Sequence, residues 1–328
     1  MSLDAADRHD IGDLVFRARQ GQARAVARLI SLVEDGAPEL REVAAALAPY
    51  AGHAQIVGVT GSPGVGKSTI VSLLVTAMRA AGNKAGVLAV DPSSPFSGGA
   101  LLGDRVRMQD HTTDAGVFIR SMATRGHLGG IAWATPQALR VLDAAGCDVV
   151  LVETVGVGQS EVDVVSLADT TVVLLAPGMG DGVQAAKAGI LEVADVFAVN
   201  KADRDGADQT VRDLRNMLSL GLRSTAGPHW RPLIVRTVAT TGQGIEDLIG
   251  AIEEHRRWMI DHGELESRRQ RRTEAEIEAL ALAQLRASLG DLRRGSALPG
   301  LAKRVVVGEL DAYRAADELI AELGAARS

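Results

Sequence analysis

Apolar and polar positions divide the chain into three blocks with different periods. Over residues 1–50 and again over 251–328, apolar residues recur at the spacing of amphipathic helices. Residues 51–250 instead interleave short runs of β-branched residues with helical stretches. This alternation is typical of a parallel sheet whose strands are joined by crossover helices. We therefore predict an α/β domain over residues 51–250, with one helical segment before it and another after it.

The β-branched runs are the candidate strands of a mostly parallel sheet. They lie at residues 55–60, 86–90, 117–120, 148–153, 171–176, 196–200 and 233–238. In the first block, helices are predicted over residues 13–19, 23–34 and 39–47, separated by glycine and proline. In the last block, the arginine-rich run at 268–272 is interpreted as the solvated face of a helix and not as a nucleic-acid patch.

Composition narrows the class of protein. The net charge of −6 over 328 residues argues against a nucleic-acid partner. No apolar run approaches the roughly 18 residues needed to cross a bilayer, and the polar N-terminus lacks the apolar core of a secretory signal. Cys147 is the only cysteine, which excludes an intrachain disulfide. These features predict a globular protein of the cytoplasm with no membrane partner.

The segment 61–69 matches the phosphate-binding Walker A loop. It follows a strand candidate and precedes a helical stretch, which is the context that this loop requires. Its glycines would let backbone N–H groups approach the phosphates, the Lys67 amine would bridge the β- and γ-phosphates, and the Ser68 hydroxyl would ligate Mg²⁺. The nucleotide-binding residues predicted here are Gly61, Ser62, Pro63, Gly64, Val65, Gly66, Lys67, Ser68 and Thr69.

The tetrad Asn-Lys-Ala-Asp at 200–203 predicts that the base is guanine. Guanine presents adjacent N1–H and 2-amino donors, which the Asp203 carboxylate can accept as a pair, whereas adenine presents an acceptor there. The Lys201 stem would lie along the base, and Asn200 would tie this loop to the phosphate loop. Backbone N–H groups after the last strand candidate are placed to contact the guanine O6, and these belong to Val238, Ala239 and Thr240.

Two carboxylates at the ends of strand candidates are predicted metal ligands beside Ser68. Asp91 follows the run 86–90, and Glu153 closes the apolar run 148–153 in the manner of a Walker B strand. Glu153 could reach Mg²⁺ directly or through a water molecule, and both possibilities stay open. Asp91 could instead be an N-cap or turn aspartate, because it precedes a proline.

Two glycine-rich loops are candidate switch elements that sense the γ-phosphate, with ordinary surface loops as the alternative. Residues 98–111 contain Asp104, and residues 177–187 end in Lys187. Val157 stands where many small GTPases keep a water-orienting glutamine, so the group that positions the attacking water is unassigned. We therefore expect slow intrinsic hydrolysis that a partner could accelerate.

With these motifs, the chain closely resembles the MeaB/ArgK family of P-loop GTPases, the bacterial relatives of the human methylmalonic aciduria type A protein. The resemblance covers nearly the whole chain, and its most characteristic part is Glu-Thr-Val-Gly-Val-Gly-Gln-Ser-Glu at 153–161. The family belongs to the SIMIBI class, whose members commonly dimerise. The other segments that carry the resemblance are 61–69, 90–95, 98–111, 120–130, 177–187 and 200–203.

The resemblance implies a Mg²⁺-dependent GTPase that binds GTP and GDP and acts as a chaperone of adenosylcobalamin-dependent methylmalonyl-CoA mutase or of a related acyl-CoA mutase. It implies that GTP hydrolysis is coupled to cofactor loading and to protection of the mutase. It also implies a homodimer formed through a C-terminal arm at 251–328. The residues to which it gives catalytic or switch roles are Lys67, Asp91, Asp104, Glu153 and Lys187.

Two other functions are weighed against this one. An older description of the family is a kinase attached to lysine/arginine/ornithine transport, but the sequence has no protein-kinase signature set. Some SIMIBI relatives deliver metals to other enzymes. Metal delivery usually needs a cysteine and histidine cluster, and one cysteine with seven scattered histidines argues against that role.

Overall fold

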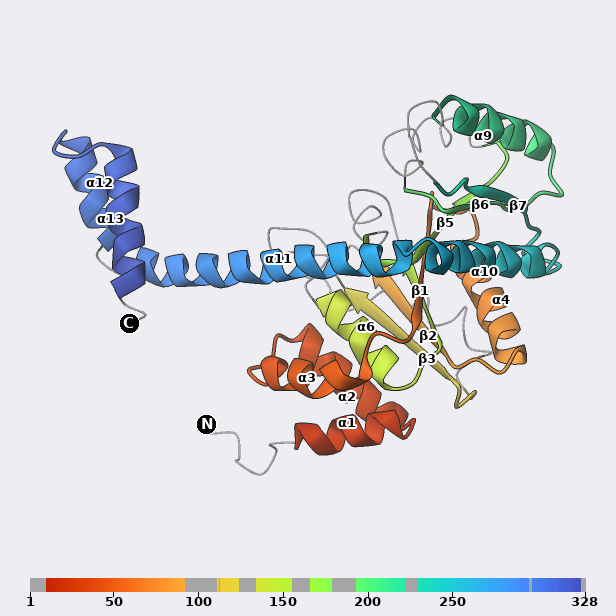
Figure 1. The fold of residues 1–328 in the computed structure, drawn as a ribbon, viewed down its shortest axis with the longest axis horizontal. Coiled ribbons are helices and arrows are strands. Elements are labelled where there is room, and N and C mark those ends of the chain that lie inside the picture. Colours follow the sequence, from red (N-terminus) through yellow and green to blue (C-terminus); the bar gives the residue numbers. More distant parts are fainter. Residues whose placement is uncertain are drawn as a thin grey trace. The chain divides into compact units, whose positions relative to one another are not determined.

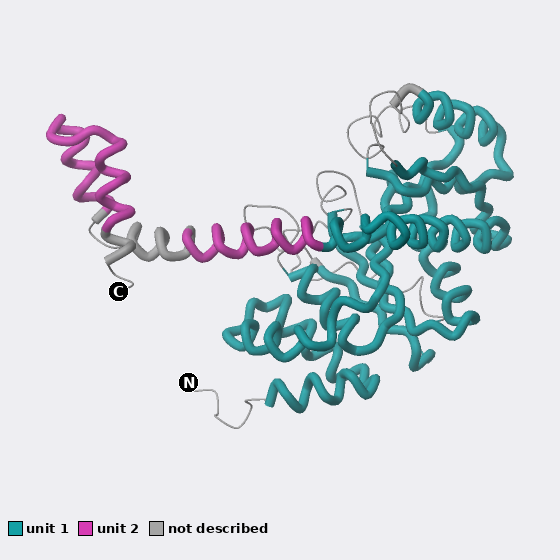
Figure 2. Tube along the Cα trace, in the orientation of Figure 1, with its two compact units in different colours: residues 1–269 teal, residues 270–328 magenta. Residues whose placement is uncertain are grey.

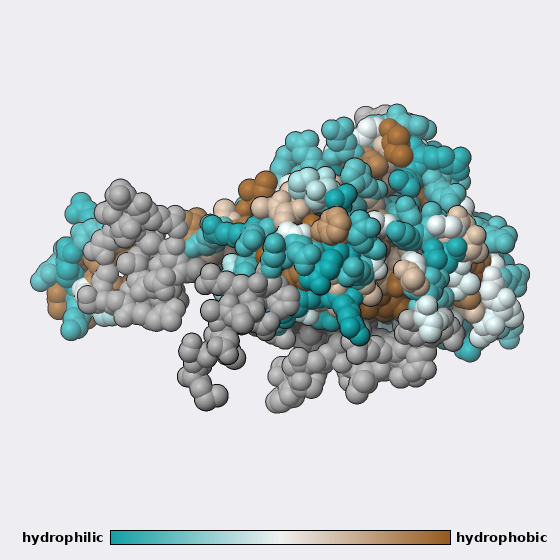
Figure 3. All heavy atoms as spheres, turned by 90° about the horizontal axis from the view of Figure 1, so that it is seen from below, coloured by the Kyte–Doolittle hydropathy of each residue, from teal (hydrophilic) through white to brown (hydrophobic). Residues whose placement is uncertain are grey.

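The computed structural model describes residues 10–91, 111, 113–123, 134–154, 166–178, 193–221, 229–294 and 297–325. The chain divides into two compact units, Met1–Arg269 and Gln270–Ser328 (Figure 2). Within the described ranges, no helix combines the length and apolar character that crossing a membrane requires. On the face drawn in Figure 3, the described residues are mostly hydrophilic, with smaller hydrophobic patches among them.

The first unit is built on a seven-stranded sheet with the order β3-β2-β4-β1-β5-β6-β7 (Figure 1). All neighbouring strands are parallel, so the predicted α/β fold is confirmed, and each predicted run overlaps one strand. The strands are β1 (Gln55–Gly61), β2 (Ala85–Asp91), β3 (Val117–Ala123), β4 (Val149–Thr154), β5 (Thr170–Leu175), β6 (Val196–Val199) and β7 (Leu233–Arg236).

Helices cover both faces of this sheet, because strand residues alternate between the two faces and both kinds are apolar. In β1, β2, β3 and β4, even-numbered residues such as Val150 and Val152 pack with α1 (Ile11–Arg19), α2 (Ala23–Glu34), α3 (Leu40–Leu47) and α6 (Ala134–Ala144). Odd-numbered residues of β1, β2 and β4, such as Val57 and Leu151, pack with α4 (Lys67–Ala80) and α10 (Ile245–Asp261). A smaller cluster joins β5 and β6 to α9 (Ala207–Gly221).

Three strands begin directly after an aspartate whose side chain extends the backbone ladder. We call Asp148, Asp169 and Asp195 the leading aspartates. The backbone N–H of Asp169 donates to the carbonyl of Ile56 at 2.8 Å, and its Oδ2 accepts the Ile56 N–H at 3.0 Å. Asp148 exchanges the same two bonds with Lys84, and Asp195 exchanges them with Thr171. Each carboxylate therefore adds one hydrogen bond at the amino end of the sheet.

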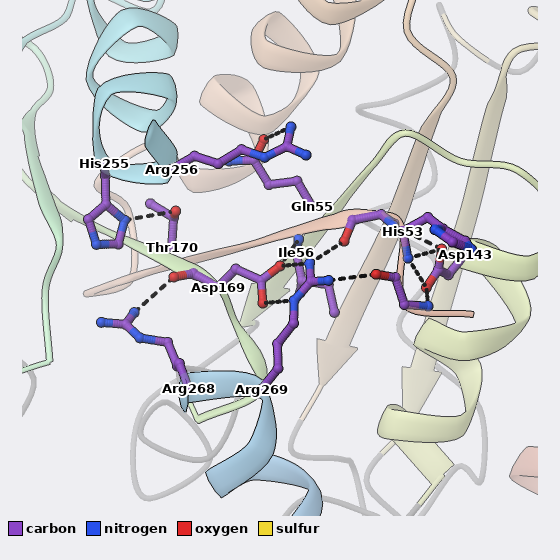
Figure 4. A network of polar contacts seen from close by, with 12 residues as sticks. His53, Gln55, Ile56, Asp143, Asp169, Thr170, His255, Arg256, Arg268 and Arg269 are labelled. Atoms are coloured by element: carbon purple, nitrogen blue, oxygen red, sulfur yellow. Dashed lines mark hydrogen bonds and ion pairs between the residues drawn. The ribbon is translucent and has the colours of Figure 1, made fainter. Parts of the chain in front are cut away.

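Consecutive arginines of α11 (Glu264–Arg294) neutralise two of the leading aspartates, and Figure 4 shows one of these pairs, Arg269 with Asp169. Arg268 Nη1 lies 2.8 Å from Asp195 Oδ2, and Arg269 Nη2 lies 2.7 Å from Asp169 Oδ2. The arginine side chains are only 30% and 25% exposed, so the interpretation of this run as a solvated face was wrong for these two residues. These two arginines are drawn inward by the buried carboxylates of Asp195 and Asp169, because a buried carboxylate without a cation would destabilise the fold.

Arg269 also holds the segment that leads from the N-terminal helices into β1. Arg269 donates to the carbonyl oxygens of Gly52 at 2.6 Å and Ala54 at 2.8 Å. From the other side, the Asp143 carboxylate of α6 accepts the N–H groups of Gly52, His53 and Ala54 (Figure 4). Residues 52–54 are therefore fixed by an anion on their N–H side and a cation on their carbonyl side.

The second unit contains the later part of α11, α12 (Ala297–Val306) and α13 (Ala312–Ala325). An ion pair between Arg304 of α12 and Glu318 of α13, at 2.6 Å, joins the last two helices. Several large apolar side chains of this unit face solvent, among them Val306 and Tyr313, which are both 86% exposed.

Removing both partners of the Arg269–Asp169 pair should destabilise the fold by less than the sum of the losses caused by removing each partner alone. We expect Arg269→Met and Asp169→Asn each to lower the free energy of unfolding by roughly 3 kcal/mol, because each leaves a desolvated charge without its partner. The double variant should lose clearly less free energy of unfolding than the two single variants lose in sum. Urea unfolding measures all three values, with Arg257→Met on α10 as the exposed control. Strictly additive losses would contradict a coupled pair.

Candidate nucleotide-binding site

The phosphate loop leaves the end of β1 and enters α4, and two of its glycines are required by their surroundings. Gly61 has φ +144°, and a Cβ built there would lie 2.3 Å from the carbonyl oxygen of Leu174. Gly66 has φ +101°, and a Cβ there would lie 2.5 Å from Nδ2 of Asn200. Any side chain at these positions would therefore separate the loop from β5 or from the base-reading tetrad.

Lys67 is the first residue of α4, and its ammonium group lies inside the loop. Nζ donates to the carbonyl oxygen of Gly61 at 2.5 Å and lies 3.3 Å from that of Ser62. The side chain is only 8% exposed. The positive charge therefore sits beside the N-terminus of α4, where backbone N–H groups and the helix dipole favour an anion.

Ser68 and Glu153 meet beside the loop. The Ser68 hydroxyl donates to Glu153 Oε1 at 2.7 Å, and both side chains are buried. Glu153 reaches α4 because it is an odd-numbered residue of β4, on the same face as Leu151. A hydroxyl and a carboxylate oxygen are hard donors of the kind that Mg²⁺ prefers, so this pair fits that ion.

The remaining acidic and basic candidates are placed only in part. Asp91 ends β2, one residue beyond Val90, which lies opposite Thr154 of β4. The backbone of Asp91 is therefore at the same edge of the sheet as Glu153, whereas its side chain lies outside the described residues. Asp104 and Lys187 lie outside them altogether, as do most of the loops that contain them.

Asn200 joins the base-reading tetrad to two other loops. Its Nδ2 donates to the carbonyl oxygen of Val65 in the phosphate loop at 2.7 Å. Its Oδ1 accepts the backbone N–H of Ala239 at 3.1 Å and the Thr237 hydroxyl at 3.2 Å. Asn200 is 1% exposed, so these bonds are made away from water. The hydrogen bond of the Thr237 hydroxyl to Asn200 was not predicted from the sequence, although Thr237 directly follows β7 at the same edge of the sheet.

Lys201 is held in a backbone conformation that side chains rarely adopt. Its φ is +55°, and among the described residues no other residue except glycine has a positive φ. Its Nζ donates to the carbonyl oxygen of Gly64 at 2.7 Å, so the side chain spans from the tetrad to the phosphate loop. A strained conformation that the surroundings maintain is common at ligand sites.

The groups proposed to recognise the base differ in their present contacts. Asp203 is exposed, which leaves its carboxylate open to an entering base. The N–H of Val238 donates to the carbonyl of Gln243 at 2.9 Å, and that of Ala239 donates to Asn200. Thr240 is exposed. Of the three N–H groups expected at O6, those of Val238 and Ala239 are therefore engaged within the protein.

Comparisons with known proteins agree with this geometry. The sequence model of the family described as "Methylmalonyl Co-A mutase-associated GTPase MeaB" matches residues 26–291. A protein of Pyrococcus abyssi named as a GTPase is 48% identical, over 95% of this chain and 97% of its own. The mitochondrial methylmalonic aciduria type A homolog of Mus musculus is 37% identical, over 76% of this chain and 64% of its own.

The fold also matches a solved structure. The crystal structure of a protein named LAO/AO transport system kinase superposes with a TM-score of 0.68 and 27% sequence identity. The match covers 99% of this chain and 100% of that one. The P-loop fold predicted from the sequence is confirmed by this likeness.

Lys67→Ala should abolish GTP hydrolysis and leave the fold intact. We expect kcat to fall by at least about 100-fold, because the variant removes a positive charge aimed at the phosphates. Turnover of GTP measures the loss, and circular dichroism checks the fold. Lys84→Ala, which removes an exposed lysine before β2, is the matched control. Normal turnover by Lys67→Ala would remove this ammonium from the mechanism.

Asp203→Asn should weaken GTP binding and favour xanthosine nucleotides. The neutral amide cannot accept both guanine donors, so we expect the Kd for GTP to rise roughly 100-fold. Xanthine carries an acceptor where guanine has its amino group, and the amide can donate to it. Titration with fluorescent GTP and XTP analogues measures both affinities, with the exposed Asp205→Asn as control. Unchanged GTP affinity would contradict base recognition by Asp203.

Proposed function

The chain belongs to the family of methylmalonyl-CoA mutase-associated GTPases named MeaB and is a GTPase, and we propose that it is a G-protein chaperone of an adenosylcobalamin-dependent methylmalonyl-CoA mutase. The observation that carries the proposal is the match of the family model over residues 26–291. The mouse relative named for methylmalonic aciduria gives further support. A related cobalamin-dependent acyl-CoA mutase would be recognised by the same kind of partner surface.

The proposed chemistry is in-line attack of water on the γ-phosphate of GTP. A bond forms between the water oxygen and phosphorus, the bond to the β–γ bridging oxygen breaks, and GDP, inorganic phosphate and the proton lost by the water are released. Lys67 would stabilise the charge on the phosphate oxygens, together with the backbone N–H groups of the loop and the N-terminus of α4. Bound Mg²⁺, held by Ser68 and Glu153, with Asp91 as a further ligand, would supply additional positive charge.

The proposed regulation is acceleration of hydrolysis by the mutase. Position 157, where many small GTPases have a glutamine that orients the attacking water, is a valine in this chain. We assign switch roles to the loops at 98–111 and 177–187, with Asp104 and Lys187 as the charged residues that sense the γ-phosphate. A partner that acts on these loops would place the attacking water, and GTP hydrolysis would then be coupled to cofactor loading.

The proposed assembly is a homodimer in the cytoplasm, with a helical segment at 1–50, a GTPase domain at 51–250 and a dimerisation arm at 251–328. Exposed apolar side chains in the second unit support this assignment, because Val306, Val307 and Tyr313 are 86%, 68% and 86% exposed. Apolar surface of this kind is a common interface between proteins.

Addition of the mutase of the same organism should raise GTP turnover by at least about tenfold over the protein alone, because partner-gated GTPases hydrolyse slowly by themselves. Release of labelled phosphate from γ-labelled GTP measures this, and the Asp203→Asn variant serves as a control that should not respond. GTP turnover that stays the same when the mutase is added would contradict the chaperone role but not the GTPase activity.

The same labelled nucleotide tests a role in transport. The name of the LAO/AO transport system kinase, whose structure this fold matches, suggests such a role, and the role predicts that label moves onto a protein substrate. The chaperone proposal predicts that all label leaves as inorganic phosphate. Label that stays on a periplasmic amino-acid-binding protein after denaturation would therefore favour the transport role.

A further inference from the structure

Two buried threonine hydroxyls join the ends of β1 and β4 behind the nucleotide site. The Oγ1 of Thr154 donates to the Oγ1 of Thr60 at 3.2 Å. Thr60 is 0% exposed and Thr154 is 1% exposed, so neither hydroxyl is solvated. Burying hydroxyls is unfavourable unless they are hydrogen-bonded, and these strands are otherwise rich in valine, which has the same shape as threonine. The polar pair therefore calls for an explanation beyond packing.

The pair lies one residue past the end of the backbone ladder between β1 and β4. β1 and β4 are paired from Gln55 and Val149 up to Val59 and Glu153. Continuing this register by one residue brings Thr60 opposite Thr154. The hydroxyl bond therefore links β1 and β4 just beyond their shared ladder, where Thr60 is still paired with β5 and Thr154 with β2.

Each threonine adjoins a group of the candidate site. Thr60 precedes Gly61, whose carbonyl oxygen accepts the hydrogen bond from Lys67. Thr154 follows Glu153, whose carboxylate accepts the hydrogen bond from Ser68.

The hydroxyls themselves lie on the other face of the sheet from those groups. Side chains alternate along a strand, so Thr60 and Thr154 share the face of Ile56, Val150 and Val152, whereas Glu153 lies on the face of α4. The threonine side chains are thus separated from Ser68 and Lys67 by the sheet.

We propose that Thr60 and Thr154 are positioning residues for GTP hydrolysis. Their hydrogen bond fixes the spacing between the carbonyl of Gly61, which orients the Lys67 ammonium, and the carboxylate of Glu153, which orients Ser68. Small displacements of such groups are costly to the chemical step, because stabilisation of the transition state depends on prearranged charges. The inference rests on the GTPase activity of the chain and is independent of which partner it serves.

The test is a double-variant series measured by single-turnover GTP hydrolysis. Thr60→Val and Thr154→Val each remove one hydroxyl and keep the shape of the side chain. We expect each to lower the rate about tenfold while the Kd for GTP stays within about twofold, since one neutral hydrogen bond is lost. The hydrolysis rate of the double variant should be no lower than that of the slower single variant, because both changes break the same bond. Thr154→Ser, which keeps the hydroxyl, should restore most of the rate.

A matched control separates positioning from stability. Thr170 of β5 is equally buried, and its hydroxyl lies 2.9 Å from Nδ1 of His255 at the opposite edge of the sheet (Figure 4). Thr170→Val therefore removes a comparable buried hydrogen bond far from the phosphate loop. It should lower the melting temperature as the other variants do and leave the hydrolysis rate unchanged.

Three results would overturn the proposal. A normal rate in both single variants would mean that the hydroxyl pair does not affect the chemical step. A normal rate in Thr60→Val with a slow Thr154→Val would mean that Thr154 acts on its own. A loss in the double variant equal to the product of the two single losses would mean that the two residues act independently. If the unsubstituted chain itself hydrolysed no GTP, the result would instead contradict the GTPase activity on which the inference rests.

Discussion

Parallel pairing of the strands is the constraint on which the rest of this structure depends. In a parallel sheet every strand points the same way, so all carboxyl ends meet at one edge. β1 lies between β4 and β5, with β6 beyond β5. That order brings Lys67, Glu153 and Asn200 together, although they are far apart in the sequence. The contact of Gly61 with the Leu174 carbonyl shows how closely the strands approach where the phosphate loop begins.

The opposite edge of the same sheet holds charges that stabilise the fold. The leading aspartates extend the ladder there, and Arg268 and Arg269 neutralise two of them. Burial is the largest single influence and lowers the pKa of Arg269, but the hydrogen bond to Asp169 and the negative charges of Asp169 and Asp143 together outweigh it, and the net direction is upward. The guanidinium therefore stays charged. The carboxylates of Asp169 and Asp195 at the amino edge are thus paired within the protein, whereas Asp203 at the carboxyl edge is exposed to an entering ligand.

Local features were predictable from the sequence, and features that depend on distant partners were not. The strands follow from β-branched runs, and the phosphate loop and tetrad follow from short motifs whose chemistry is contained within a few residues. The pairing of Arg268 with Asp195 and the bond of Thr60 with Thr154 join residues of separate elements. Nothing in the local pattern distinguishes a buried arginine from a solvated one until its partner is known, which is why that run was misinterpreted. The positive φ of Lys201 is likewise set by contacts between loops.

The contacts now made inside the site also bear on how a nucleotide is bound. Lys67 donates to the loop carbonyl of Gly61, and Lys201 donates to that of Gly64. A phosphate that takes over the Lys67 ammonium exchanges one hydrogen bond for another, so the gain in binding energy is a difference and not a sum. The exchange favours phosphate because the bond then joins two opposite charges. The loop is held in shape before the ligand arrives by Asn200, whose amide stays bound to Val65, and this prearrangement reduces the entropy lost on binding.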